Sequence, residues 1–235
     1  MTPYYQDEAV CIYHGDCREV LPFLPKTDLL LTDPPYGIGE AAKNHASRGK
    51  PFGSAGTHRK QMAYATEYER SDWDNAPPPR WLFDWLMEHT THQVIFGGNY
   101  FGLPPSSCWL VWDKDNGESD FAGESDFADC ELAWTNLRKA VRRLTYRWNG
   151  MLQEPGVRKE TRVHPTQKPE AVMRWALLQA PDGCSVLDPF MGSGTTLVAA
   201  KRLGRKAIGI ERERTYCDIA VERLRQSALP LEMGA

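Results

Sequence analysis

The sequence lacks any apolar run that approaches the roughly 20 residues of a membrane-spanning helix. Its first ten residues, MTPYYQDEAV, have neither the basic start nor the hydrophobic region of a secretion signal. The six cysteines are scattered, with no CxxC pair and no histidine at ligand spacing, which favours reduced thiols over disulfides or zinc. These absences predict a cytoplasmic globular protein with no membrane partner and no metal site.

The composition bounds the size of the core and the choice of partners. With 235 residues, of which 41% are hydrophobic and 25% charged, the chain can form one α/β domain over residues 1–235. The net charge is only −3, but residues 138–168 hold nine Lys or Arg against two acids. This segment therefore carries +7 and the rest −10, so it is either a phosphate-binding surface or a solvated basic face.

Short apolar stretches bounded by turn residues predict strands, and longer stretches between them predict helices. We expect strands over 10–14, 28–33, 93–98, 108–113, 184–190 and 206–211, and helices over 78–90, 168–180, 195–204 and 214–228. Near-continuous apolar strands that alternate with helices indicate an α/β fold with a mostly parallel sheet and helices on both faces.

Two segments do not fit this alternation. Residues 40–75 are assigned to a mobile loop, because residues 40–60 are rich in small, glycine and basic residues. Residues 117–129 contain GESDFA twice in tandem, and the repeat is too short for a solenoid unit. We interpret it as a duplication within a surface loop that carries no chemistry.

The stretch VLDPFMGSGTTLVAAKRLGRKAIGIE, residues 186–211, reads as a strand, a glycine turn, a helix and a second strand. Glu211 follows Gly192 by 19 residues, where a nucleotide-binding βαβ unit places the acid that holds ribose hydroxyls. Leu197 replaces the third glycine of a dinucleotide fingerprint, and no phosphate-binding P-loop occurs. The pattern favours a phosphate-free adenosine cofactor such as S-adenosylmethionine over a purely structural turn.

The stretch LLLTDPPYG, residues 29–37, ends an apolar strand with two prolines, which fix the backbone and remove two N–H donors. An exocyclic amine on a base is a poor nucleophile, because its lone pair is conjugated with the ring. Asp33 and the C=O of Pro34 can accept its two hydrogens, and Tyr36 can stack on a flipped base. The alternative is an ordinary Asp-Pro-Pro turn.

Six motifs in a particular order resemble those of the beta-group amino-DNA methyltransferases. They are HGDCREVL (14–21), TDPPYG (32–37), IFGGNYF (95–101), HPTQKP (164–169), DPFMGSGTT (188–196) and GIE (209–211). The glycine turn follows the catalytic motif by more than 150 residues, whereas it comes first in many other methyltransferases. This permuted order makes the resemblance more specific than either motif alone.

The resemblance implies a Rossmann-like S-adenosylmethionine-dependent methyltransferase that methylates the N6 amino group of a flipped adenine in double-stranded DNA. It implies a catalytic pocket of Asp33, Pro34, Pro35 and Tyr36, and a cofactor site of Asp16, Asp33, Thr166, Lys168, Asp188, Phe190, Gly192, Gly194 and Glu211. Adenine is preferred because DPPY, rather than SPPY, resembles the adenine enzymes. The alternatives are a cytosine-N4 methyltransferase, an inactive DNA-binding module and an NAD-binding oxidoreductase.

The resemblance also places the target-recognition elements in the basic segment. We assign an inserted recognition segment to 114–163, with DNA contacts from Arg138, Lys139, Arg142, Arg143, Arg147, Arg158, Lys159 and Arg162. The loop at residues 40–60 is a second candidate DNA contact, and we expect it to close over the cofactor and the flipped base. So short a recognition segment predicts a short target site or help from a second subunit in a homodimer, and a cognate restriction enzyme is left open.

Overall fold

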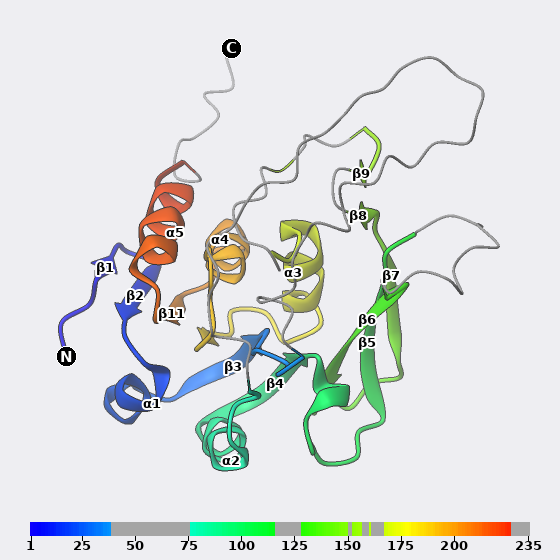
Figure 1. The fold of residues 1–235 in the computed structure, drawn as a ribbon, viewed down its shortest axis with the longest axis horizontal. Helices are drawn as coiled ribbons and strands as arrows, with labels where there is room; N and C mark the ends of the chain where they lie inside the picture. The colour runs from blue at the N-terminus through cyan, green and yellow to red at the C-terminus, as the bar shows by residue number, and fades with distance from the viewer. Residues whose placement is uncertain (39–75, 116–127, 150–151, 157–159, 161–166, 227–235) are drawn as a thin grey trace.

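A computed structural model describes residues 1–38, 76–115, 128–149, 152–156, 160 and 167–226. Among these residues, nine strands form one sheet in the order β1-β2-β11-β10-β3-β4-β6-β5-β7, and β8 and β9 form a separate hairpin (Figure 1). The strands are β1 Tyr5–Gln6, β2 Val10–His14, β3 Thr27–Thr32, β4 Thr90–Phe96, β5 Cys108–Asp113, β6 Cys130–Thr135, β7 Arg142–Thr145, β8 Trp148–Asn149, β9 Leu152–Gln153, β10 Val186–Asp188 and β11 Ala207–Glu211.

The centre of the sheet is parallel, as the apolar strands predict. Strands β2, β11, β10, β3 and β4 pair in parallel, with Leu29 opposite Val186 and Leu31 opposite Val94. The short β1 is antiparallel to β2, and β6 runs antiparallel between β4 and β5. All six predicted strands are present: β2 and β5 have the predicted bounds, and the other four have shifted ends. We predicted no strand where β1, β6, β7, β8 and β9 lie.

Helices cover both faces of the sheet, and the alternation of side chains along β3 shows why (Figure 1). Leu30 packs in the cluster that contains α1 (Cys17–Val20), the 3₁₀ turn Leu21–Phe23 and α2 (Arg80–His89). Leu29 and Leu31 point the other way, into the cluster of α3, α4 and α5. These helices span Glu170–Leu177, Thr195–Arg202 and Arg214–Gln226. The four predicted helices are present. The first three have shorter bounds than predicted, and residues 227–228 of the fourth lie outside the described residues.

The pairing of β10 with β3 explains the permuted order of the motifs. The late unit β10-α4-β11 inserts between β2 and β3, which are joined early in the chain through α1. The next described helix after β3, α2, packs on one face of the sheet, and α4, which follows β10, packs on the other. In such a sheet a crevice opens at the carboxyl ends of these two strands. Among the described residues, no helix combines the length and apolar character that crossing a bilayer requires.

Candidate active site

A cavity of about 400 Å³ lies at the carboxyl ends of β2, β3, β10 and β11. It collects most of the residues that the sequence assigned to catalysis and to the cofactor. Those in its wall are Asp16, Asp33, Pro35, Lys168, Asp188, Phe190, Gly192 and Glu211. Thr166 lies outside the described residues. Pro34 and Tyr36 are not in this wall. We call Asp188–Thr195 with Glu211 the glycine-turn side of the site, and Asp33 and Lys168 with the neighbouring Tyr36 the DPPY side.

Asp188 links the two sides across the crevice. It ends β10 in a buried position, where Thr32 Oγ1 donates a hydrogen bond to its Oδ1 at 2.8 Å. The N–H of Phe190 donates to the same oxygen at 3.2 Å. Burial raises the pKa of Asp188 to about 6, because these neutral donors do not compensate fully for the loss of water.

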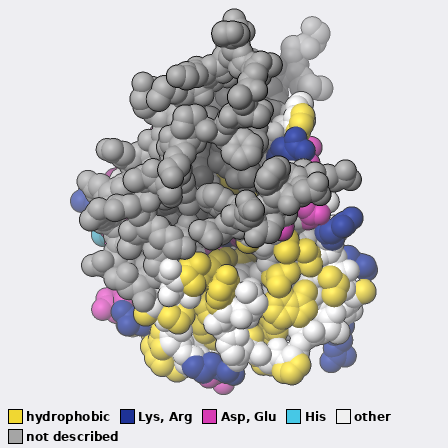
Figure 2. Space-filling model, turned by 45° about the vertical axis from the view of Figure 1, so that its right-hand side comes forward, with side chains coloured by type: hydrophobic (Ala, Val, Ile, Leu, Met, Phe, Trp, Pro, Cys, Tyr) yellow, Lys and Arg dark blue, Asp and Glu magenta, His cyan; other side chains and the backbone are white. Residues whose placement is uncertain are grey.

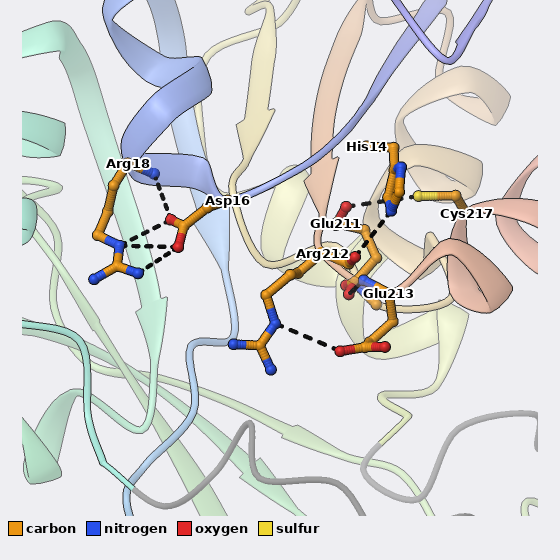
Figure 3. Close-up of polar contacts among 8 residues, drawn as sticks. His14, Asp16, Arg18, Glu211, Arg212, Glu213 and Cys217 are labelled. Atoms are coloured by element: carbon orange, nitrogen blue, oxygen red, sulfur yellow. Dashed lines mark hydrogen bonds and ion pairs between the residues drawn. The ribbon is translucent and has the colours of Figure 1, made fainter.

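Glu211 is anchored at the end of β11 by backbone groups. Its Oε2 accepts the N–H of Gly192 at 2.9 Å, and its Oε1 accepts the N–H of Glu213 at 2.8 Å. Figure 3 shows Glu211 beside Arg212, whose guanidinium pairs with Glu213 at 3.4 Å rather than with Glu211. Burial raises the pKa of Glu211 to about 7. The carboxylate keeps lone pairs for ligand hydroxyls and has no cation of its own among these partners.

The glycine turn brings the backbone close to this carboxylate. Gly192 and Gly194 have φ of 50° and 78°, left-handed values that disfavour other residues. Gly194 is the N-cap of α4, and a Cβ placed on it would lie 2.7 Å from Cβ of Ala220. Gly194 therefore shapes the turn from behind and is not in the cavity wall, whereas Gly192 is.

Asp16 lies at the N-terminus of α1, and its carboxylate already has a partner. Its Oδ1 accepts the N–H of Arg18 at 2.9 Å, and Nε and Nη2 of the Arg18 guanidinium bond to both oxygens (Figure 3). The hydrogen bonds from Arg18 lower the pKa of Asp16. The predicted contact of Asp16 with an adenine amine stays a prediction, and it would add to this pair or displace part of it.

On the DPPY side, Asp33 accepts one hydrogen bond on each oxygen. Tyr36 Oη donates to Oδ1 at 2.6 Å, and Lys168 Nζ donates to Oδ2 at 2.6 Å. Burial raises the pKa of Asp33 above its ordinary value, and the Lys168 ammonium opposes that rise. We predicted a role for Lys168 at the cofactor. It does line the cavity, but in this structure its ammonium contacts Asp33 and, at 3.0 Å, Oε2 of Glu131.

The ring of Tyr36 is fixed by its neighbours. It stacks on Tyr100 with centroids 4.9 Å apart and an interplanar angle of 16°, and it contacts Phe101 edge-on at 6.1 Å. Gly97, at φ 66°, passes so close that an added Cβ would lie 2.1 Å from the ring. Gly37 likewise passes close to Pro77, whose Cδ would lie 2.4 Å from a Cβ added to Gly37.

Several residues of this site were missed in the sequence. Pro77–Pro79 and Leu82 line the cavity, and Glu131 on β6 contacts both Lys168 and Lys114. A Pro-rich stretch before a helix signals only a helix start. Glu131 follows the GESDFA repeat and lies in a strand that we did not predict, so no local pattern marked it.

The predicted DNA-binding residues fall into three groups. Arg138, Arg142 and Arg143 are exposed, and the last two lie on the edge strand β7. Figure 2 shows Lys and Arg side chains, in dark blue, around the edge of one face of the molecule. Lys139 Nζ donates to the carbonyl of Gln179 at 2.6 Å, and Arg147 Nη2 pairs with Asp115 at 2.6 Å. Arg158, Lys159, Arg162 and the loop 40–75 lie outside the described residues. The described part of 114–163 includes β6 and β7 of the main sheet.

The comparisons with known proteins agree with this geometry. Residues 104–222 match the N6_N4_Mtase family, described as DNA methylase. The Type II methyltransferase M2.LlaDCHI of Lactococcus lactis subsp. cremoris is 49% identical over 258 residues, which cover 96% of this chain and 93% of that protein. The Type II methyltransferase M.ScaI of Streptomyces caespitosus is 28% identical over 263 residues, which cover 97% and 86%.

Solved structures share the fold. The M1.HpyAVI–SAM complex has a TM-score of 0.54 at 26% identity, over 92% of this chain and all of that one. The cytosine-N4-specific PvuII DNA methyltransferase has a TM-score of 0.55 at 16% identity, over 99% and 90%, which is a likeness of fold alone. From the family match and the extent of the M2.LlaDCHI alignment, this chain belongs to the N6_N4_Mtase family of DNA methylases.

Proposed function

We propose that the protein transfers a methyl group from S-adenosylmethionine to the N6 amino group of an adenine flipped out of double-stranded DNA. The observation that carries the proposal is the position of Asp33. Its carboxylate lines the same cavity as Asp188 and Glu211, across the crevice between β3 and β10. Asp33, the proposed acceptor for the amine, and Glu211, the proposed acceptor for the ribose hydroxyls, therefore line the same cavity.

The donors and acceptors of the glycine-turn side fit the cofactor. Glu211 offers a carboxylate to the ribose hydroxyls, and the apolar wall at Leu82 and Phe190 suits an adenine ring. Neither a phosphate-binding glycine triplet nor a P-loop is present in the sequence. The solved M1.HpyAVI relative is a complex with SAM. When bound, S-adenosylmethionine supplies an electrophilic methyl group on a sulfonium.

The DPPY side provides the position of the amine. A carboxylate has about four acceptor sites, so Asp33 can still take an amine hydrogen beside its bonds from Tyr36 and Lys168. The carbonyl of Pro34, held by the ring that follows it, is proposed as the second acceptor. Both hydrogen bonds favour a pyramidal nitrogen with its lone pair toward the methyl group. Positioning then contributes most of the rate, without a covalent protein intermediate.

The exposed edge of the sheet is proposed as the DNA contact. β7 presents Arg142 and Arg143 to solvent, and Arg138 is exposed just before it. Phosphate contacts of this kind bind DNA without reading its sequence. The relatives named Type II methyltransferases support a role in restriction and modification. A homodimer and a cognate restriction enzyme remain part of the proposal.

Nucleoside mass spectrometry tests the reaction and the base together. The purified chain is incubated with unmethylated double-stranded DNA and methyl-labelled S-adenosylmethionine, and the DNA is digested to nucleosides. Labelled N6-methyladenine is the expected product. N4-methylcytosine would retain the reaction and overturn the choice of base. If cofactor binding is demonstrated by calorimetry and no nucleoside is labelled, the proposed activity is wrong.

A further inference from the structure

Four alternating charges run from the DPPY side into the sheet. Asp33 Oδ2 lies 2.6 Å from Lys168 Nζ, and the same ammonium lies 3.0 Å from Glu131 Oε2. The other oxygen of Glu131 lies 2.8 Å from Nζ of Lys114. The chain of four is neutral overall, and Lys168 is shared between two carboxylates.

This network is held by several parts of the fold. The Lys168 side chain is only 8% exposed, and its ammonium lies 5.4 Å from the ring centroid of Phe96 and 5.7 Å from that of Tyr36. Glu131 is placed by β6, where it pairs with Trp112 of β5. The N–H of Lys114 donates to the carbonyl of Asp129 at 2.9 Å, which fixes the start of that side chain.

We propose that Glu131 is a positioning residue for the methyl transfer: by sharing the Lys168 ammonium, it keeps Asp33 a strong hydrogen-bond acceptor for the target amine. The inference rests on the proposed function of Asp33. Without Glu131, the Lys168 ammonium would interact with Asp33 alone among these two carboxylates. The carboxylate of Asp33 would then be more strongly neutralised and would accept a hydrogen bond from the amine more weakly. Lys114 acts in the opposite sense, because it draws negative charge away from Lys168.

The charges that face these groups have consistent effects. Burial raises the pKa of Asp33, Lys168 lowers it and Glu131 raises it, while the Tyr36 hydroxyl lowers it by donating to Oδ1. Burial raises the pKa of Glu131, but Lys168 and Lys114 together bring it to about 2. Burial lowers the pKa of Lys168, and its two carboxylates raise it above the ordinary value, so the ammonium stays charged. Asp188 is a further carboxylate near Asp33, and the charge of Asp33 helps to raise its pKa.

The experiment measures the titration of Asp33 directly. NMR of isotope-labelled aspartate follows its carboxyl carbon in the wild type, Glu131→Gln and Lys114→Gln, with Asp33→Asn to assign the signal. We expect Glu131→Gln to lower the midpoint by about one pH unit and Lys114→Gln to raise it. Asp113→Asn is the control. Asp113 follows Trp112, the partner of Glu131 on β5, and its carboxylate pairs with Arg143 rather than with Lys168. Its removal should leave the midpoint of Asp33 unchanged.

Activity gives a second readout of the same network. At saturating DNA and cofactor, kcat of Glu131→Gln should fall about fivefold, with KM for S-adenosylmethionine unchanged. Glu131→Asp, which retains the charge, should recover part of the loss. Midpoints that do not move, or that move in the same direction in both variants, would overturn the inference. A wild type that methylates no DNA would refute the proposed function, and the titration would still decide whether Glu131 controls Asp33.

Discussion

The carboxylates on the two sides of the site have different kinds of hydrogen-bond partner. On the glycine-turn side, hydroxyl and backbone N–H donors hold Asp188 and Glu211, and burial raises their pKa values to about 6 and about 7. On the DPPY side, lysine ammonium groups face Asp33 and Glu131, and the pKa of Glu131 falls to about 2. The glycine-turn side is therefore sensitive to pH near neutrality, whereas Glu131, which contacts Lys168 of the DPPY side, stays ionised.

The strongest test of this contrast is Asp33→Ala. If the DPPY side acts on the amine alone, this change should lower methyl transfer by about a thousandfold and leave cofactor affinity within a few-fold. Single-turnover assays and calorimetry measure the two quantities. Asp28→Ala is a matched control at the start of β3, because Asp28 bonds to Ser185 outside the cavity wall. Substantial residual methyl transfer by Asp33→Ala would contradict the catalytic role proposed for Asp33.

The glycine-turn side should show its pH dependence in cofactor binding. An ionised carboxylate accepts hydrogen bonds from ribose hydroxyls more strongly than a protonated one, so affinity should rise about tenfold as the pH increases through the pKa of Glu211, about 7. Glu211→Gln should bind more weakly and retain only the smaller dependence that Asp188 contributes near pH 6. Calorimetry of both proteins between about pH 5 and about pH 8.5 measures this. A wild-type affinity that does not change across this range would contradict the assignment of Glu211.

The stability of the cofactor-free protein should change in the opposite direction. Folded Glu211 binds its proton up to about pH 7, whereas the unfolded chain releases it near its ordinary value of 4.5. The folded state therefore binds more protons between these values, and the unfolding free energy falls as the pH rises through them. Thermal unfolding should show this fall in the wild type and a smaller one in Glu211→Gln. Equal falls in the two proteins would assign the effect to other groups.

The edge strand β7 lies at the end of the sheet on the same side of β10 as β3, which leads into Asp33. Its basic residues should affect the binding of DNA rather than of the cofactor. Replacing Arg142 and Arg143 with alanine removes two exposed cations, so the logarithmic salt dependence of DNA binding should weaken by about 1.8. Lys139→Ala is the control, because Lys139 Nζ is engaged by the Gln179 carbonyl and should change the slope less. Fluorescence anisotropy across a salt series measures both. An unchanged slope in the double variant would place the DNA contact elsewhere.

Local patterns predicted much of the two sides and little of what connects them. The stretches around Asp33 and Gly192 carry their own backbone and side-chain signals, and both were assigned from a few adjacent residues. Glu131 acquires its role only because β6 runs antiparallel between β4 and β5, a pairing of distant segments that no short pattern specifies. Lys168 was predicted at the cofactor site from its motif and lines the cavity, but its carboxylate partners depend on the same tertiary pairing.

The smallest predicted effect isolates the packing behind the glycine turn. Gly194 and Gly204 lie at the two ends of α4 with left-handed φ of 78° and 67°. Gly204→Ala should cost about 1 kcal/mol of unfolding free energy from backbone strain, because nothing lies within 4 Å of the added Cβ. Gly194→Ala should cost more and also weaken cofactor binding, because its Cβ would lie 2.7 Å from that of Ala220 and push the turn toward the cavity. Chemical denaturation and calorimetry of the two variants separate strain from displacement. If both variants lose the same stability and keep the cofactor affinity of the wild type, the turn tolerates the extra atom at Gly194. The packing of Gly194 against α5 would then not determine the shape of the glycine-turn side.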